Sequence, residues 1–326
     1  MTWLVWRQYR AQAAIASVLL AALAAVILVD GFAIASRWHT ILVTCAGNGG
    51  CLQQQPDLVN GVVSDLPYVC LIVPVVLGML WGAPLVASEL EARTSDLVWT
   101  QSITRTRWLA AKAGWLLLAA VACGGAISAL ATWWSGPINA ESATAFTPGQ
   151  FDTQGIVPIG YAVFAMALGI ATGTVARRTL PAIAVVLGGF IALRLVIANV
   201  FRPHYLTAIT TYSKLTGTFA PPGQAWVLAQ GAVSRTGQTV AAGYGDLEPA
   251  LPAACQRLLP GTPTAKNGAS INAVFSCMQA HGWRGFVTFQ PASRYWPFQG
   301  IETGIYVLLA AALIAVTFVV VRRRDA

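Results

Sequence analysis

The sequence predicts an all-α membrane protein with six transmembrane helices, and three observations lead to that prediction. Apolar residues make up 56% of the 326 residues, and the mean hydropathy is +0.63. These residues occur in long runs rather than in the alternating or amphipathic patterns of soluble proteins. Six runs reach the roughly 20 residues that a helix needs to cross a bilayer. They cover residues 13–36, 68–88, 108–134, 157–176, 180–200 and 300–321.

The distribution of Lys and Arg predicts a protein of the cell membrane with both termini in the cytoplasm. If the N-terminus is inside, the inner segments hold 11 of these residues and the much longer outer segments hold 8. The short outer segments decide the orientation, because segment 136–157 has no Lys or Arg and segment 37–68 has only Arg37. Positive residues concentrate in short cytoplasmic loops, which explains the pI of about 9.5 without a nucleic-acid partner. The inner segments are 1–12, 89–112, 176–180 and 322–326.

The cysteines predict two disulfides outside the cell. Cys45 and Cys51 fall in the first outer segment, and Cys255 and Cys277 fall in the long one. The other two cysteines lie inside apolar runs. Because disulfides persist in oxidising compartments, we expect the pairs Cys45–Cys51 and Cys255–Cys277. Four free thiols are the alternative.

Residues 1–12 predict a short helix that lies in the inner membrane interface. Its aromatic residues suit the headgroup depth and its arginines suit the water side. A secretory signal is the alternative, because Ala33–Ala35 imitates a cleavage site. The apolar run exceeds 20 residues, however, whereas the apolar part of a signal is about 7–15 residues long. A retained helix is therefore favoured.

Asp30, Arg194 and Glu302 are charged residues within or at the ends of the apolar runs. Asp30 lies near the outer end of the first run, where it is either functional in the membrane or already solvated. Arg194 lies in the outer half of the fifth run and Glu302 at the outer start of the sixth. An Arg194–Glu302 pair would lower the cost of burying either charge. Alternatively, each side chain reaches water separately.

Small residues and proline mark the second and fourth runs. Gly78–Gly82 and Gly169–Gly173 each have the GxxxG spacing that permits close helix approach, although this spacing is common in glycine-rich membrane sequences. Pro84 is expected to break or kink the inner end of the second run. Arg177 and Arg178 predict a very short inner turn, so that the fourth and fifth runs form a tight hairpin.

Residues 201–299 predict a small mixed α/β insert outside the cell. The sequence therefore divides into a membrane domain of residues 1–200, this insert, and a last span with tail of residues 300–326. The stretch 271–282 predicts a short helix ending at Gly282, and 284–292 predicts a strand. Pro203, Pro221, Pro222 and the region Gly243–Gly245 predict loop. Tyr295, Trp296 and Phe298 predict an aromatic belt at the outer interface.

The segment between the second and third runs has the highest density of charge in the chain. It predicts a short amphipathic helix on the cytoplasmic face, where a soluble partner could act on the membrane protein. A solvated interfacial loop with pairs along one helix is the alternative. Its candidate partner contacts are Glu89, Glu91, Arg93, Asp96, Arg105 and Arg107.

Motifs for catalysis, metal binding and nucleotide binding are missing from the sequence. There is no HExxH, no GxSxG and no GxxxxGK[ST]. The three histidines, His39, His204 and His281, are scattered outside the predicted spans, and the outer segment 136–157 shows no chemistry. We therefore expect no metal site and no cofactor in this chain, and any nucleotide must be bound by another subunit.

Three stretches make the chain resemble the permease subunits of type-2 class ABC exporters of the high-GC Gram-positive type. They are MTWLVWRQYRAQ, GAPLVASELEARTSDLVWTQSITRTRWLAAK and CMQAHGWRGFVTFQPASRYWPFQGIETG. The resemblance covers essentially the whole chain. In the family, the second span is followed by an acidic turn, a Thr (here Thr94) and a coupling helix on the ATPase. The family often has Gly before this Thr, whereas here Arg93 precedes it.

The resemblance implies a dimer of two six-span halves, each bound to a separate cytosolic ATPase subunit that holds ATP and Mg²⁺. The second half is another copy or a homologue. The resemblance also implies alternating access, and the apolar, poorly charged interior favours export of a hydrophobic or amphipathic compound (drug, antibiotic or lipid-like), with antibiotic resistance as one outcome. A membrane sensor or scaffold whose insert binds a ligand is the alternative. A membrane enzyme is disfavoured because a catalytic set is missing.

Overall fold

The chain divides into two compact units in the computed structural model. The first unit comprises Met1–Arg202 with Trp296–Ala326, and the second is Pro203–Tyr295. The structure describes residues 14, 17–18, 20–29, 31–33, 36, 62–85, 87, 104–141, 146, 148–215, 225–241, 251, 253–256, 258 and 271–323.

Long apolar helices build the first unit. Four of those in the described residues are long and apolar enough to cross a membrane: Thr106–Gly136, Val157–Ala176, Thr179–His204 and Ala292–Arg323. Two shorter apolar helices, Leu20–Ala33 and Cys70–Gly82, lie where the first two spans are predicted. The elements are α3 (Val62–Leu77), η2 (Gly78–Gly82), α6 (Arg105–Glu141), α7 (Pro148–Phe151), α8 (Val157–Ala176), α9 (Thr179–Val196), η3 (Ile197–Phe201), η4 (Arg202–His204) and α13 (Tyr295–Arg323). The prediction of a helical membrane protein is thus confirmed in outline.

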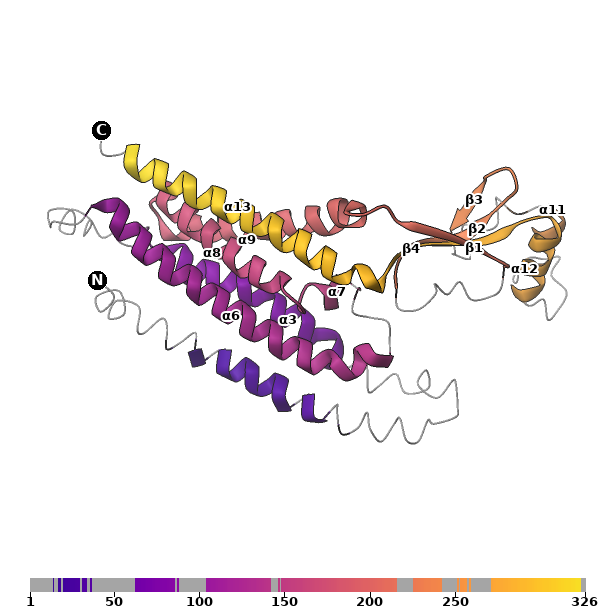
Figure 1. The fold of residues 1–326 in the computed structure, drawn as a ribbon, viewed down its shortest axis with the longest axis horizontal. Helices are drawn as coiled ribbons and strands as arrows, with labels where there is room; N and C mark the ends of the chain where they lie inside the picture. The colour runs from indigo at the N-terminus through magenta and orange to yellow at the C-terminus, as the bar shows by residue number, and fades with distance from the viewer. Residues whose placement is uncertain are drawn as a thin grey trace. The chain divides into compact units, whose positions relative to one another are not determined.

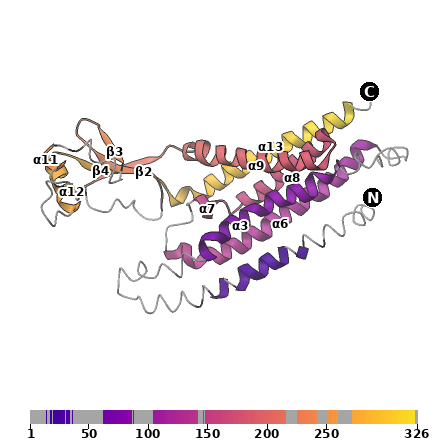
Figure 2. The same cartoon turned by 180° about the vertical axis from the view of Figure 1, so that it is seen from behind.

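Helix α8 lies at the centre of this unit, between α3 and α6 on one side and α9 and α13 on the other (Figures 1 and 2). Fourteen of its twenty residues are buried. Its many glycines and alanines allow neighbouring helices to approach closely, which is how membrane helices associate without a large hydrophobic driving force. The Cα of Thr303 on α13, for example, lies 3.3 Å from where a Cβ on Gly160 would be.

The two GxxxG motifs pack against each other. A Cβ on Gly82 would lie 2.8 Å from the Met166 carbonyl oxygen, and a Cβ on Gly169 would lie 2.8 Å from the Ala83 nitrogen. At this crossing η2 is a π-helical turn, in which the Ala83 N–H donates to the Gly78 carbonyl at 2.9 Å. Pro84 follows directly and cannot donate to the helix ladder. The irregularity that Pro84 predicts therefore takes the form of a π turn.

Cations gather at one end of the first unit, which we call the basic end. Exposed Arg107 is at the start of α6, and Arg322 and Arg323 are at the end of α13. Arg177 and Arg178 form the turn between α8 and α9, which confirms the predicted tight hairpin. Arg177 has φ 55°, and its N–H donates to the Gly173 carbonyl at 3.1 Å. A left-handed residue of this kind commonly ends a helix.

The second unit contains a four-stranded antiparallel sheet with the order β1-β4-β2-β3. Central strand β4 pairs Val287 with Thr211 of β1, and a bulge interrupts β2 between Val227 and Ala229. Buried side chains of α12, including Val274 and Met278, pack with residues of the sheet and of α11. The elements are β1 (Ile209–Ser213), β2 (Ala225–Val233), β3 (Thr239–Ala241), α11 (Ala253–Gln256), α12 (Ile271–Ala280) and β4 (Arg284–Pro291).

Several local predictions for the insert are confirmed. Helix α12 ends before Gly282, whose φ of +81° is a conformation that L side chains rarely adopt, and β4 follows immediately. Cys255 and Cys277 form the predicted disulfide. Cys45 and Cys51 lie outside the described residues.

Two other predictions are wrong. Pro203 is not in a loop, because it belongs to η4, which continues the apolar helix to His204. Phe298 does not belong to an exposed aromatic belt, because it is fully buried with its ring 5.3 Å from that of Phe146. Trp296 is 63% exposed, as the predicted aromatic belt requires.

The glycine crossing can be tested by Gly169→Ala. The added methyl group would lie too close to the backbone of η2, so we expect a loss of about 1–3 kcal/mol of stability. Gly188 of α9 is the matched control, because nothing lies within 4 Å of a Cβ there. Gly188→Ala should leave stability unchanged or raise it by up to about 1 kcal/mol. Thermal unfolding in detergent, followed by circular dichroism, would contradict the crossing if both variants behaved alike.

The disulfide can be tested by the double variant Cys255→Ala with Cys277→Ala. The bond links two residues that are 22 positions apart. Removing a disulfide that closes a loop of that size lowers the free energy of unfolding by about 3 kcal/mol. We expect limited proteolysis of the full chain to cut within 203–295 much sooner in the variant, while the helices of the first unit stay protected. Equal protection with and without the bond would contradict this prediction.

Candidate functional site

Four charged side chains meet in the first unit, at the end opposite the basic end, and we call them the buried charge cluster. Asp152 follows α7, Arg194 lies on α9, Arg202 begins η4 and Glu302 lies on α13. The side chains of Asp152, Arg202 and Glu302 are at most 2% exposed, and that of Arg194 is 18% exposed. Unpaired charges are very costly in such surroundings, so the geometry of their pairing decides whether the fold is stable.

Arg202 and Glu302 form a two-point ion pair. The Arg202 Nε donates to Glu302 Oε2 at 2.8 Å, and its Nη2 donates to Oε1 at 2.6 Å. This fork-to-carboxylate arrangement is the strongest ion-pair geometry available to an arginine. It joins Arg202, the last residue of the first unit before the insert, to α13.

Asp152 bridges the two arginines. Its Oδ2 accepts from Arg194 Nη2, and its Oδ1 accepts from Arg202 Nη2. The hydroxyl of Tyr161 on α8 lies between the carboxylates, 2.9 Å from Asp152 Oδ1 and 2.7 Å from Glu302 Oε1. Two carboxylates and two guanidinium groups give the buried charge cluster no formal net charge, which limits its electrostatic cost in an apolar environment.

The π-helical turn η3 explains how Arg194 and Arg202 reach the same carboxylate. Residues of an α-helix follow one another at about 100°, so two residues eight positions apart would point about 80° away from each other. A π turn absorbs one extra residue, which reduces the difference to about 20°. Without η3, Arg202 would be rotated away from Asp152.

The segment that carries Asp152 is held by both neighbouring helices. On α13, the Gln299 Oε1 accepts from the backbone N–H groups of Ile156 and Val157, each at 2.9 Å, and its Nε2 donates to the Phe151 carbonyl at 2.9 Å. On α6, Ser128 donates to the Gly155 carbonyl, and φ at Gly155 is 72°. The Arg202 guanidinium carbon lies 4.5 Å from the centre of the Phe151 ring, a cation–π contact.

The structure joins the predicted partners Arg194 and Glu302 through intermediates. The ion pairs run from Arg194 to Asp152, from Asp152 to Arg202 and from Arg202 to Glu302. Arg194 and Glu302 therefore belong to one cluster, as their predicted similar depth suggested, but each pairs with another residue of that cluster.

The predicted ATPase contacts are only partly described. Arg105 is the first residue of α6, and Arg107 is exposed in its first turn. Lys112 is buried, with its Nζ 4.4 Å from the centre of the Trp108 ring. The remaining predicted ATPase contacts lie outside the described residues: Glu89, Glu91, Arg93, Thr94 and Asp96. Asp30 also lies outside them.

Sequence analysis missed Asp152, Arg202 and Tyr161. The interpretation of 136–157 as a segment without chemistry is wrong, because Asp152 is the centre of the buried charge cluster. A signal was available: charge is only 10% of the composition, and these charges stand at the ends of apolar runs, where intramembrane charges are often functional.

The described residues contain one group with metal-ligating atoms close together, Cys255, Cys277 and His281, within 4.8 Å of one another. The two sulfurs are bonded to each other, and a disulfide offers no thiolate to a metal. His281 Nδ1 lies 2.9 Å from the Cys277 carbonyl oxygen. In the oxidised state this group therefore does not fit a metal.

The apolar helices and the charge-balanced cluster between them define a multi-pass membrane protein. A family model described as "ABC-2 membrane transporter related" matches residues 17–202. The chain belongs to this family. No curated protein and no solved structure matches the chain. The matched region includes every residue of the buried charge cluster except Glu302.

The pairing can be tested by Arg202→Met, Glu302→Met and the double variant. Each single variant leaves a buried charge without its partner, so we expect a loss of about 3–5 kcal/mol of stability. The double variant should lose less than the sum of the two, because neither charge is then stranded. Arg107→Met, at an exposed position, is the control. Thermal unfolding in detergent measures all four, and additive losses in the double variant would contradict a direct pair.

Proposed function

We propose that this chain is the permease subunit of an ATP-driven exporter, coupled to a separate cytosolic ABC ATPase. The observation that carries the proposal is the match of the transporter family model to residues 17–202, the region that contains most of the helical bundle. The proposed complete unit has six spans, with Leu20–Ala33 and Cys70–Gly82 as the two shorter ones. A second permease copy or homologue completes the transport pathway.

The basic end is proposed to face the cytoplasm. Arg107, Arg177, Arg178, Arg322 and Arg323 all lie there, and short cytoplasmic loops carry the excess of Lys and Arg in membrane proteins. The buried charge cluster then lies near the outer face, and the second unit is outside the cell. Both termini would be cytoplasmic.

The ATPase is proposed to act on residues 89–107. This segment connects the end of the second apolar helix to the start of α6, so both of its attachments are at the basic end. One attachment leads to η2, whose backbone is packed against Gly169 of α8. A displacement of the segment by the ATPase would therefore be passed to α8, the central helix of the first unit.

The buried charge cluster is proposed to close the outer end of the bundle while the inner end is open. Its partners come from the segment before α8, from α8 itself, from α9 with η4, and from α13. Movement of the segment before α8, of α9 with η4 or of α13 would separate charges in an apolar environment, which is costly. Such a network resists partial opening, as alternating access requires.

The substrate is proposed to be hydrophobic or amphipathic, because the described helices carry few charges and those of the buried charge cluster are paired with one another. A sensor or scaffold is the second candidate, favoured by one observation: Arg202 and Glu302 flank the two connections to the second unit and bind each other. Ligand-induced movement of the insert would act directly on that pair.

The proposal can be tested with the permease co-purified with its ATPase in lipid vesicles. We expect Glu89→Ala with Glu91→Ala to reduce transport per ATP hydrolysed, because contact with the motor is weakened. Asp65→Ala is the control, because Asp65 lies in the first turn of α3, at the other end of the helix that leads to the segment. If the chain copurified with no ATPase, or if the acidic variant coupled normally, the exporter proposal would be abandoned.

A further inference from the structure

We infer that the first unit holds one acyl chain of a membrane lipid in a cavity between the helix Leu20–Ala33 and α6. This inference needs only the membrane location of the bundle. It does not depend on coupling to an ATPase, and the two proposals can fail separately.

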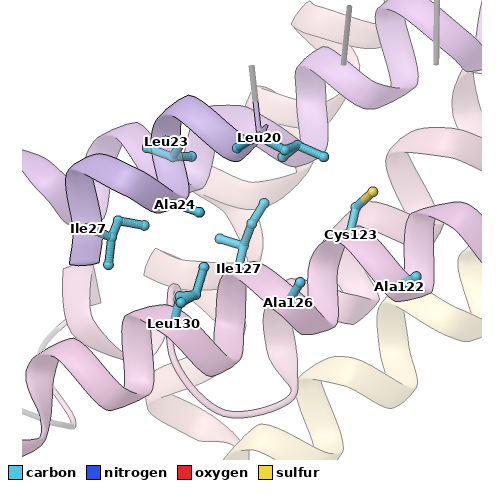
Figure 3. A pocket seen from close by; sticks show the side chains of 10 residues that line it. Leu20, Leu23, Ala24, Ile27, Ala122, Cys123, Ala126, Ile127 and Leu130 are labelled. Atoms are coloured by element: carbon cyan, nitrogen blue, oxygen red, sulfur yellow. The ribbon is translucent and has the colours of Figure 1, made fainter. Parts of the chain in front are cut away.

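The cavity is partly open and has a volume of about 350 Å³. Figure 3 shows its two walls: Leu20, Leu23, Ala24 and Ile27 come from the first helix, and the facing residues come from α6. Four of the ten lining residues are alanines, whose small side chains leave space between the walls. The lining residues are Leu20, Ala21, Leu23, Ala24, Ile27, Ala122, Cys123, Ala126, Ile127 and Leu130.

The lining offers nothing to a polar ligand. Nine of the ten lining residues are aliphatic, and the tenth is Cys123, whose thiol is at most a weak donor. Binding sites for drug-like molecules place a few polar groups to fix orientation, and none of the lining side chains supplies one. Water is also a poor occupant, because it needs two to four polar partners. An aliphatic chain is the chemistry that this surface complements.

The cavity is partly open, and the two helices that form its walls expose apolar side chains. On the first helix, Val26 and Val29 are 53% and 72% exposed, and on α6, Leu118 and Val121 are 63% and 42% exposed. These residues lie on the same helices as the walls, within the apolar segments. Hydrocarbon therefore already surrounds the cavity, and a chain can enter sideways without crossing a polar layer.

The size of the cavity favours one chain over a larger occupant. Its volume is near the lower end of the roughly 300–1,000 Å³ typical of ligand pockets. A helix of a second permease copy is about 10–12 Å across with its side chains, which is wide for a recess of this volume. Leaving the recess empty would forfeit dispersion contacts on both walls, so lipid is expected to fill it.

The test uses the full chain in nanodiscs of phosphatidylcholine with a diazirine at the end of one acyl chain. Light converts the diazirine to a carbene, which inserts into nearby C–H bonds with loss of N₂. Peptide mapping then locates the labelled residues. We expect labels within 20–27 and 122–130, with Ala126→Phe and, from the other wall, Ala24→Phe each abolishing the label on the facing helix.

Ala129→Phe is the matched control, because Ala129 is an exposed alanine of α6 that does not line the cavity. It should keep the wild-type labels, and labelling of the exposed face of α9 should not change in any variant. The inference is overturned if the cavity residues are labelled no more than α9, if Ala126→Phe and Ala129→Phe behave alike, or if 122–130 crosslinks to a second copy of the chain instead of to lipid.

Discussion

Burying charge in an apolar bundle imposes a constraint on which the rest of the first unit depends. Asp152, Arg194, Arg202 and Glu302 are individually too costly to bury, and only their mutual pairing makes the arrangement stable. Because the four come from three separate segments, the pairing fixes the segment before α8, the end of the helix Thr179–His204 and the start of α13 together. The π turn η3 and the amide of Gln299 serve this geometry: the first rotates Arg202 inward, and the second holds the backbone that carries Asp152.

The two ends of the first unit are held by different physical interactions, and α8 takes part in both. Near the basic end, Gly169 allows backbone contact with η2, an interaction of short range that depends on the absence of side chains. Near the other end, the Tyr161 hydroxyl lies between two carboxylates. A rotation of α8 at the glycine crossing therefore moves a hydrogen-bonding group inside the buried charge cluster. This gives a physical route between the ends that needs no mobile loop.

The sequence could predict what depends on neighbouring residues. Apolar runs predicted the helices, Arg177 and Arg178 the hairpin, and Gly282 the boundary between α12 and β4. Features that depend on distant pairing could not be predicted. From its neighbours in the sequence, Asp152 is expected to be a solvated loop residue. Its burial depends on Arg202, which lies 50 positions later. Strand β1 is exposed along its whole length and has no alternating pattern, so only its pairing with β4 identifies it.

Helix α6 shows why small residues alone do not predict a structural role. On one face, Gly124 permits close contact with α8: a Cβ there would lie 3.1 Å from the Ala162 Cβ and from the Pro158 carbonyl oxygen. On another face, Ala122 and Ala126 border open space. The same kind of side chain produces tight packing where a helix backbone approaches and a recess where it does not. The partner helix therefore decides the outcome. On our inference, an acyl chain then fills the recess and becomes part of the packing of the helix Leu20–Ala33.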